Sequence, residues 1–373
     1  MSALCLVMLL MAQPLKACRL WAAVSDSLPS TIIEEHLLTE PFSLEVLSQA
    51  HRNGWGLSFF EEGMHYLNRG LPPAYEDSLF DVAVDTLLQS RSQLALAHIR
   101  NCSSGLCDIP DPHPFSRDFL GKPWLLAHNG DIDKQVLLSL IDPLFLDSHP
   151  PHTGSSPEEW VDSELYFLYL LQELEISGGE LLPALAEVVL QLRLRLPGEY
   201  AYLNILLTDG ESLWAYREGV SLYWKQGGVE TTPYTAVASR YPGETQEDWQ
   251  ALDNGELLEL RAGQSPQLFQ IEDYFDWSPA PPNLDTVQFR AWPNPGLSAP
   301  RLSFQLDRSQ PLEITLHDPS GRLLKRIAKG EFARGEHVLE WQHGTLPAGV
   351  YLARLRLADR QITQKLVLLK GKP

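Results

Sequence analysis

The sequence predicts an α+β protein in which a mixed domain of strands and helices precedes a small all-β sandwich. Up to about residue 270, short apolar runs typical of strands alternate with longer segments whose apolar residues recur at helical spacing. From residue 289 onward, apolar and polar residues alternate with a period of two, and no helical periodicity occurs. The proline-rich run at residues 273–286 breaks the first pattern and predicts a linker.

Length and charge also indicate two domains. The 373 residues exceed what one compact core usually takes. Residues 287–373 carry 14 Lys and Arg against 7 Asp and Glu, whereas the preceding 286 residues carry a net charge of −26. Such a change of sign suggests separately evolved modules. We therefore expect a leader over residues 1–17, a first domain over 18–270, a linker over 271–288 and a sandwich over 289–373.

The elements of the first domain follow from these patterns. Strands are expected at residues 18–25, 54–63, 92–100, 123–130, 235–240 and 255–263, with a hairpin at 202–218 that turns at Asp209-Gly210. Helices are expected at residues 73–89, 156–175 and 179–196. In the first helix, the apolar residues predicted to share the packed side are Leu79, Val82, Val84, Leu87 and Leu88.

The strands of the second domain are marked by alternation and by turns. The expected strand segments are residues 312–328, 335–342 and 349–370, with turns at Ser320-Gly321 and Ala348-Gly349. These features predict a small all-β sandwich.

The first residues resemble an export leader. Residues 3–12 form an apolar run that is too short to span a bilayer as a helix, which needs about 20 residues. The run suits the apolar region of a signal peptide with cleavage after Ala17, although no Lys or Arg precedes it. An unusual N-terminal tail and a misassigned start codon are the alternatives.

Charge and cysteine pattern exclude several classes of function. A net charge of −19 argues against nucleic acid as the main partner, because phosphate binding requires a basic surface. The four cysteines and 11 histidines show no zinc-ligand spacing, so no metal is expected. In an exported protein Cys102 and Cys107 could form a small-loop disulfide, which would leave Cys18 unpaired.

Cys18 is a candidate nucleophile. If it became the N-terminus, its own α-amino group, with a pKa near 8, could take the thiol proton. Acyl transfer also needs an oxyanion hole, which Asn129 and the N–H of Gly130 could supply at the end of a strand. Arg100 could bind a carboxylate and Asp162 an ammonium group, so the pair would select an amino-acid substrate.

The first domain resembles the class II glutamine amidotransferases, most closely the short standalone branch. The matching stretches run in order from Cys18 to about Gly263: "CRLW", "HRNGWGLSFFEEG", "LALAHIRNCSSG", "DPHPFSRDFLGKPWLLAHNGDI", "VDSELYFLYLL", "NILLTDGESLWAYR" and "VASRYPGETQEDWQALDNGELLEL". The resemblance implies a four-layer αββα N-terminal-nucleophile hydrolase sandwich. It also implies Cys18 as the nucleophile, Arg100 and Asp162 as glutamine anchors, and Asn129 with Gly130 as the oxyanion hole.

Other positions and departures refine this expectation. His98, His113 and His128 also match family positions, and we interpret them as buried or loop-fixing histidines. The family's cysteine usually follows the initiator Met, whereas here 17 residues precede it, so leader removal would have to free its amine. No synthase domain follows, so the expected reaction is hydrolysis of the side-chain amide of glutamine or of a γ-glutamyl compound, without a cofactor.

The second domain resembles the C-terminal sorting domain of the type IX secretion system. The matching positions are Pro293-Asn294-Pro295, Asp318 with Gly321, and Ala348-Gly349-Val350-Tyr351. The resemblance implies passage through the periplasm to the cell surface or medium, with the type IX machinery as a partner. A generic β-sandwich appendage, such as a carbohydrate-binding one, is the alternative.

A second interpretation of Cys18 assigns the protein to another class. "LKAC" also resembles a lipobox, in which the cysteine is acylated and the protein would be a catalytically inactive, lipid-anchored binding module. Lys16 is unusual in a lipobox, and the following Arg-Leu-Trp matches a strand of the enzyme family rather than a tether. A third interpretation is a cytoplasmic enzyme that begins at Cys18.

Overall fold

The computed structural model describes most of the chain. It covers residues 18–61, 63–109, 111–196, 202–229, 232–275, 289–292, 301–306, 308–319, 321–340, 346–347, 349–357 and 361–368. The leader, most of the linker, Pro293-Asn294-Pro295 and Ala348 lie outside these residues. None of the helices in the described segments combines the length and apolarity needed to cross a membrane.

The chain divides into two compact units. The first takes in the chain up to Leu137 and from Leu146 to Asp276. The second takes in the short segment Leu138–Phe145 and the chain from Trp277 onward. The first unit mixes helices and strands, which confirms the mixed character predicted for it.

The first unit contains two antiparallel sheets. One has seven strands in the order β11-β9-β10-β1-β4-β2-β3. The other has six strands in the order β13-β12-β8-β7-β6-β5. The strands of the first are β1 (Arg19–Ser25), β2 (Trp55–Glu61), β3 (Met64–Gly70), β4 (Leu94–Ile99), β9 (Tyr223–Val229), β10 (Thr232–Ala238) and β11 (Gln250–Ala251). Those of the second are β5 (Phe115–Phe119), β6 (Lys122–Asn129), β7 (Asn204–Thr208), β8 (Ser212–Tyr216), β12 (Glu256–Arg261) and β13 (Gln267–Gln270).

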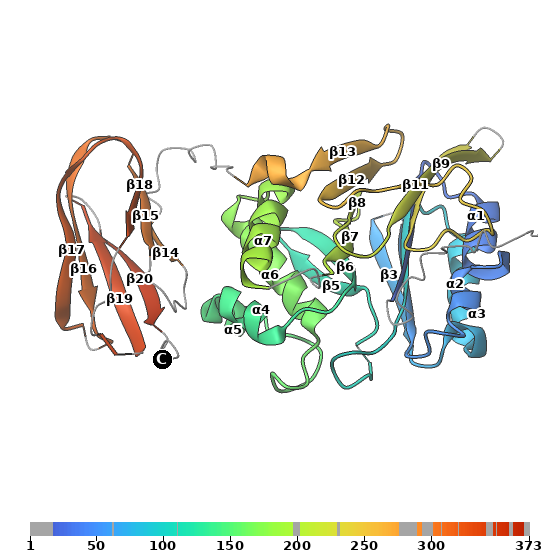
Figure 1. Ribbon diagram of the computed structural model, residues 1–373, viewed down its shortest axis with the longest axis horizontal. Coiled ribbons are helices and arrows are strands. Elements are labelled where there is room, and N and C mark those ends of the chain that lie inside the picture. Colours follow the sequence, from blue (N-terminus) through green and yellow to red (C-terminus); the bar gives the residue numbers. More distant parts are fainter. Residues whose placement is uncertain are drawn as a thin grey trace, which may run out of the picture. The chain divides into compact units, whose positions relative to one another are not determined.

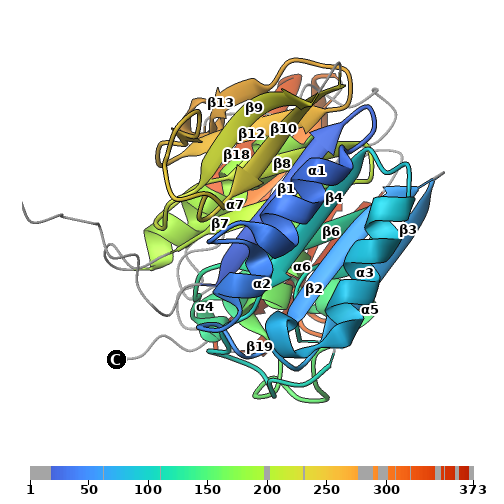
Figure 2. The same cartoon turned by 90° about the vertical axis from the view of Figure 1, so that its right-hand side faces the viewer.

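Helices cover the outer faces of these sheets, as Figures 1 and 2 show. On the seven-stranded sheet lie α1 (Ser30–Glu34), a π-helical turn (Glu35–Thr39), α2 (Leu44–Leu47) and α3 (Ser78–Gln89). On the six-stranded sheet lies α6 (Asp162–Ile176), which packs against α7 (Leu181–Arg195). The remaining helical segments are a 3-10 turn (Ala74–Glu76), α4 (Lys134–Leu140), α5 (Pro143–Ser148) and a 3-10 turn (Ile271–Tyr274).

Strand β1 is buried on both faces because both are covered. Side chains alternate between the two faces of a strand. Trp21 and Ala23 therefore enter the core beneath the helices α1–α3. Leu20 and Ala22 enter the core shared with the six-stranded sheet. The start of this strand is thus fixed from two sides, which matters because Cys18 immediately precedes it.

The helix predicted at residues 73–89 exists, but the prediction of its packed side is partly wrong. Leu79 and Val82 are exposed, at 61% and 57% of their surface. The buried residues are Phe80, Ala83, Val84 and Leu87. The helix begins at Ser78 with Asp77 as its cap, and a stripe at i, i+3, i+4 and i+7 counted from Phe80 meets the sheet.

The helix expected from residue 156 begins later. Its first residue is Asp162, so Glu158 and Glu159 lie in the preceding turn rather than in the helix. Asp162 and Glu164 are the acidic residues of its first turn. The hairpin predicted at Asp209-Gly210 is confirmed: β7 and β8 pair as antiparallel neighbours around this turn.

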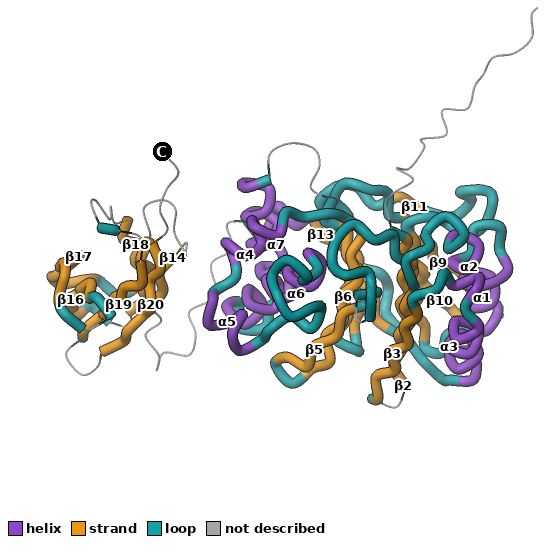
Figure 3. The backbone as a smooth tube through the Cα atoms, turned by 90° about the horizontal axis from the view of Figure 1, so that it is seen from below, coloured by secondary structure: helices purple, strands orange, loops and turns teal. Residues whose placement is uncertain are grey.

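Every element described in the C-terminal part of the chain is a strand (Figure 3). One sheet contains β14 (Phe289–Trp292), β15 (Arg301–Leu306) and β18 (Gly335–Glu340). The other contains β16 (Gln310–His317), β17 (Leu323–Phe332), β19 (Gly349–Arg356) and β20 (Gln361–Leu368). Apolar residues of both sheets, among them Phe304 and Ile314, form one buried core.

Candidate functional site

Cys18 immediately precedes β1, a central strand of the seven-stranded sheet, and lies beside the end of β4. The antiparallel register pairs Arg19 with Ile99, so the start of β1 meets the residues that follow β4. The backbone N–H of Asn101 donates to Sγ of Cys18 at 3.3 Å. The cysteine is buried, with 9% of its surface exposed, and its thiol is free.

The surroundings of this thiol favour its protonated form. Burial raises the pKa of Cys18, because a thiolate loses its hydration there. The hydrogen bond from Asn101 and the charge of Arg100 act in the opposite direction, whereas the charge of Asp162 raises the pKa further. Attack by this sulfur at neutral pH therefore requires a nearby base that takes the proton.

Arg100 directly follows β4, and its guanidinium is buried. Nη1 lies 3.3 Å from Oδ2 of Asp111, and Nη2 donates to the carbonyl of Ser104 at 2.6 Å. Its backbone N–H donates to the carbonyl of Gly54, which fixes the end of the strand. A guanidinium has five N–H bonds, so these two contacts leave donors that can bind a carboxylate.

Asp162 is the first residue of α6 and is also buried. Its Oδ1 accepts the hydroxyl hydrogen of Ser104 at 2.5 Å, and its Oδ2 accepts the N–H of Ile132 at 3.0 Å. As the first residue of the helix, Asp162 lies at the end that carries positive partial charge. Each of its oxygens retains a lone pair that an ammonium group could use.

Asn129 and Gly130 lie where β6 ends. Asn129 is buried, and within the described part of the chain its Oδ1 has no hydrogen-bond partner. A Cβ at residue 130 would lie 1.8 Å from the carbonyl oxygen of Tyr202, so the close approach requires glycine. The loop that follows reaches Asp162 through Ile132.

The structure therefore groups the candidates in two linked sets. The charges of Arg100 and Asp162 both act on the pKa of Cys18, and Ser104 contacts both charged side chains directly. Asn129 and Gly130 are connected to Asp162 by the loop through Ile132. Within the residues that the structure describes, no hydrogen bond joins Asn129 or Gly130 to Cys18.

Three buried histidines support the strand ends around the site. Nδ1 of His113 lies 3.0 Å from Nε2 of His98 and accepts the N–H of His128 at 3.4 Å. His128 contacts the hydroxyl of Ser163 at 2.8 Å, one residue into α6. Burial lowers the pKa of all three, so they are neutral hydrogen-bonding groups at neutral pH. This geometry supports the interpretation that they hold the strands and loops in place.

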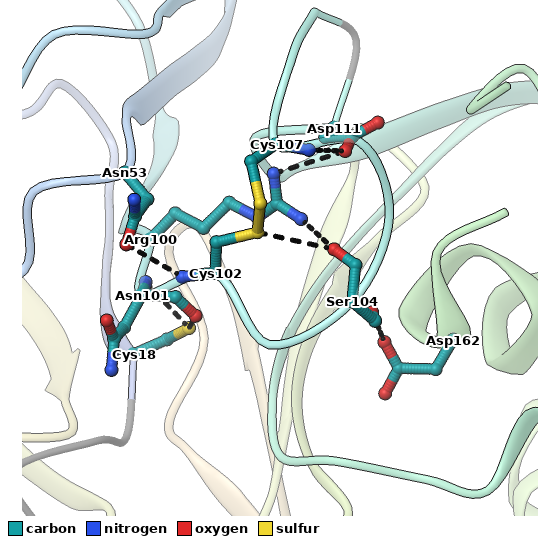
Figure 4. Close-up of a disulfide and its surroundings, with 9 residues drawn as sticks. All are labelled: Cys18, Asn53, Arg100, Asn101, Cys102, Ser104, Cys107, Asp111 and Asp162. Carbon is teal, nitrogen blue, oxygen red and sulfur yellow. Dashed lines mark hydrogen bonds and ion pairs between the residues drawn. A yellow bond between two sulfur atoms is a disulfide. The ribbon is translucent and has the colours of Figure 1, made fainter. Parts of the chain in front are cut away.

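Sequence reasoning missed the residues that contact the candidate anchors Arg100 and Asp162. Ser104, Asp111 and the backbone of Asn101 make the contacts with Arg100, Asp162 and Cys18 that are described above. All three lie in an irregular loop without periodicity. The pairing of Cys102 with Cys107 that the sequence allowed is present, with Cα atoms 6.0 Å apart (Figure 4).

Comparison with known proteins gives a consistent family. The model of the family described as "Glutamine amidotransferases class-II" matches residues 39–226, half of the chain. The matched range contains Arg100, Asn129, Gly130 and Asp162, and it begins after Cys18.

Individual relatives share modest identity with the chain. The Escherichia coli protein YafJ carries the name of a glutamine amidotransferase. It is 28% identical to this chain over 182 residues, which are 47% of this chain and 63% of that protein. The chain thus spans less than two thirds of that relative. A gamma-glutamyl-hercynylcysteine sulfoxide hydrolase of Mycolicibacterium smegmatis is 27% identical over 246 residues, 65% of this chain and 93% of that protein.

One solved structure that matches is a class-II glutamine aminotransferase domain protein from Silicibacter pomeroyi. It has a TM-score of 0.45 and 21% identity, and the match covers 68% of this chain and 99% of that chain.

Proposed function

The chain belongs to the class II glutamine amidotransferase family, and on this basis we propose that it is an exported amidohydrolase with Cys18 as its nucleophile. Its substrate would be the side-chain amide of glutamine or a γ-glutamyl compound. The observation that carries the proposal is that the thiol of Cys18 is buried and free, and that the charges of Arg100 and Asp162 both act on its pKa. A cationic and an anionic group beside one thiol suit an α-amino-acid head group.

The proposed reaction uses the N-terminal amine as the base. The α-amine of Cys18 takes the thiol proton, and the sulfur attacks the amide carbon to form a tetrahedral intermediate. Asn129 and the N–H of Gly130 stabilise its negatively charged oxygen. Collapse breaks the C–N bond, and the ammonium form of the N-terminus returns a proton to the leaving nitrogen. The product of this half is a thioester on Cys18 and one molecule of ammonia or amine.

Water completes the cycle. The amine of Cys18, now neutral, takes a proton from a water molecule that attacks the thioester carbon. The same oxyanion site holds the second tetrahedral intermediate, and the C–S bond then breaks. The sulfur recovers a proton and the γ-carboxylate leaves. The γ-carboxyl group of the product loses its proton to water, and the amine and sulfur of Cys18 carry the other protons of these steps.

The substrate class is supported from two sides. Arg100 retains N–H donors and Asp162 retains lone pairs, so both charges of a free α-amino acid or an N-terminal γ-glutamyl group can be bound. The relative from Mycolicibacterium smegmatis is named as a hydrolase of a γ-glutamyl compound. We therefore propose hydrolysis without transfer of ammonia to a second substrate.

The finer features of the fold belong to the same proposal. We propose that the helices and the two sheets of the first unit form the four-layer αββα sandwich; the helices on the outer faces of both sheets support this. We propose that residues 1–17 are a signal peptide, 18–270 the catalytic domain, 271–288 a linker and 289–373 a sorting domain. Leader removal would then free the amine of Cys18, so export and activation would be one event.

The proposed sorting domain is supported by one of its turns. Where β16 turns into β17, the N–H of Gly321 donates to the carbonyl of Asp318 at 2.9 Å, and Oδ1 of Asp318 accepts the N–H of Arg322. Gly321 has a φ of +85°, a value that favours glycine. Two of the positions that resemble the sorting domain are thus explained by the backbone of a tight turn.

An assay of the chain that begins at Cys18 tests the proposed function. Glutamine and a γ-glutamyl amide should each yield glutamate, with one ammonia or amine released per molecule. The Cys18→Ala variant should lose at least about 10³-fold in kcat, because no other residue of the site can form the thioester. Its circular dichroism spectrum should match that of the unchanged protein. Turnover by the variant at the original rate would contradict the assignment.

A further inference from the structure

The loop that follows Arg100 is closed by a disulfide and contacts both proposed anchors. Cys102 and Cys107 are bonded and enclose Ser104 (Figure 4). The carbonyl of Ser104 accepts from Nη2 of Arg100 at 2.6 Å, and its hydroxyl donates to Asp162 at 2.5 Å. One residue of the loop therefore bridges the cationic and the anionic group.

The far end of the loop is tied to the same cation. The N–H of Cys107 donates at 2.8 Å to Oδ2 of Asp111, the oxygen that lies 3.3 Å from Nη1 of Arg100. Cys107 has a φ of 56°, which is uncommon for a residue with a side chain. The disulfide thus joins the two ends of a loop in which the carbonyl of Ser104 contacts Arg100 and the N–H of Cys107 contacts Asp111, the ion-pair partner of Arg100.

The loop also packs closely against the start of α6. Gly105 has a φ of +79°, and a Cβ there would lie 2.6 Å from both Asp111 Oδ2 and Val161 Cγ2. Val161 directly precedes Asp162. A change in the path of the loop would therefore change the position of Ser104 relative to both charged groups.

We propose that the loop closed by Cys102 and Cys107 is a positioning device that sets the spacing of Arg100 and Asp162 for an α-amino-acid head group, with Ser104 as the positioning residue. This inference rests on the proposed function of the site. The carboxylate and ammonium groups of such a substrate are attached to one carbon, so the two anchors must keep a fixed separation. A bridge through one residue provides that separation directly.

The disulfide matters because it restricts the conformations that the loop between Cys102 and Cys107 can adopt before the substrate binds. A loop that is ordered before the substrate arrives does not have to be ordered during binding. Opening the bond should therefore weaken substrate binding and leave the chemistry at Cys18 unchanged. A dithiol opens it by exchange: two thiols form on the protein while the dithiol is oxidised to its cyclic disulfide.

Three variants of the mature chain test this inference. Cys102→Ser/Cys107→Ser removes the bond, Ser104→Ala removes the hydroxyl that bridges to Asp162, and Ser103→Ala is the matched control. Ser103 is exposed, and within the described residues none of the hydrogen bonds involves its side chain. The double variant should raise the KM for glutamine about tenfold and change kcat less than about twofold. Ser104→Ala should also raise the KM about tenfold with little change in kcat, whereas Ser103→Ala should leave both KM and kcat unchanged.

A labelling comparison separates positioning from general damage. Iodoacetamide needs only the thiol of Cys18, whereas a diazoketone analogue of glutamine also needs both anchors. In the double variant Cys18 is the only cysteine of the mature chain. The rate of inactivation by the analogue should fall about tenfold, and the rate of alkylation by iodoacetamide should stay unchanged. Treating the unchanged protein with dithiothreitol should reproduce the effect of the double variant.

The possible outcomes distinguish this inference from the proposed function. An unchanged KM and unchanged labelling by the analogue in both the double variant and Ser104→Ala would overturn the inference. Equal loss of both labelling reactions in Ser104→Ala, whose fold is checked by thermal unfolding, would also overturn it. If the unchanged protein released no ammonia from glutamine or from a γ-glutamyl amide, the proposed function would fail. The labelling ratio would still decide whether the loop positions the anchors.

Discussion

At the scale of single residues, burial rather than sequence pattern decides the protonation state of the polar groups. Cys18 is kept as a thiol and His98, His113 and His128 are kept neutral, each because burial disfavours the charged form. Of the cations that act on the thiol, Arg100 forms an ion pair with the carboxylate of Asp111. Cys18 therefore needs a base to ionise at neutral pH.

His36 gives a prediction on pH that does not involve the site. Nε1 of Trp21 donates to its Nδ1 at 3.0 Å, a contact that requires a neutral ring. Burial lowers the pKa of His36 from 6.5 to about 3. Below pH 6.5 the unfolded chain binds a proton that the folded chain does not, so this contribution to stability is lost as the pH falls. The loss is about 1.4 kcal/mol per pH unit.

Urea unfolding at pH 7, 6 and 5 checks this, with His36→Gln as the reference. Below pH 6.5 the unfolding free energy of the unchanged protein should fall relative to the variant by about 1.4 kcal/mol per unit. The other buried histidines are the same in both proteins and cancel in the difference. A difference that stays constant with pH would show that His36 is not held neutral.

At the scale of elements, the ends of strands carry the candidate site. Cys18 precedes β1, Arg100 follows β4, and Asn129 ends β6. The antiparallel pairing of β1 with β4 brings the first two together. The loop that follows Asn129 is held at the first turn of α6, because the N–H of Ile132 donates to Oδ2 of Asp162.

Gly130→Ala tests whether the end of β6 needs this close approach. The added Cβ would lie 1.8 Å from the carbonyl oxygen of Tyr202 and 2.3 Å from Nε2 of His128. The backbone must shift, so the variant should lose about 2 kcal/mol or more of unfolding free energy. It should also lose most of its activity. Urea denaturation and the ammonia assay measure the two effects.

Gly228→Ala is the matched control, because among the described residues its added Cβ would meet only the carbonyl of Thr232, at 3.8 Å. It should change the unfolding free energy by less than about 1 kcal/mol. Equal stability of the two variants would mean that the end of β6 can relax around the methyl group.

The sequence predicted the elements better than the contacts between them. Strands such as β1 and β4 were predictable because their apolar runs are short and continuous. In α3, Leu79 and Val82 are as apolar as the residues that are buried, so only the docking on β2 and β3 decides the packed side. Ser104 and Asp111 were not predictable, since their roles depend on contacts across an irregular loop.

At the scale of the whole molecule, two units each have buried apolar cores of their own. In the first unit, one core lies beneath helices α1–α3 and another lies between the two sheets. In the C-terminal part, eleven buried residues from β14–β16, β19 and β20, together with Leu357, form a third core. Units with separate cores can unfold in separate transitions.

Deleting residues 287–373 should therefore leave the first unit folded. The truncated chain, starting at Cys18, should keep kcat and KM within about twofold of the full chain and should unfold in a single transition. The full chain should show two transitions in differential scanning calorimetry, one of which matches that of the truncated chain. Loss of activity in a folded truncated protein would mean that the C-terminal part contributes to catalysis.

The central claim is that Cys18 acts as a free N-terminal nucleophile, and the state of that residue in the native host tests it most directly. Intact mass and N-terminal sequencing of the mature protein measure this state. We predict a chain that begins at Cys18 with an unmodified amine and thiol. An acylated Cys18, or a chain that still carries residues 1–17, would contradict the claim, because the amine could not then act as the base.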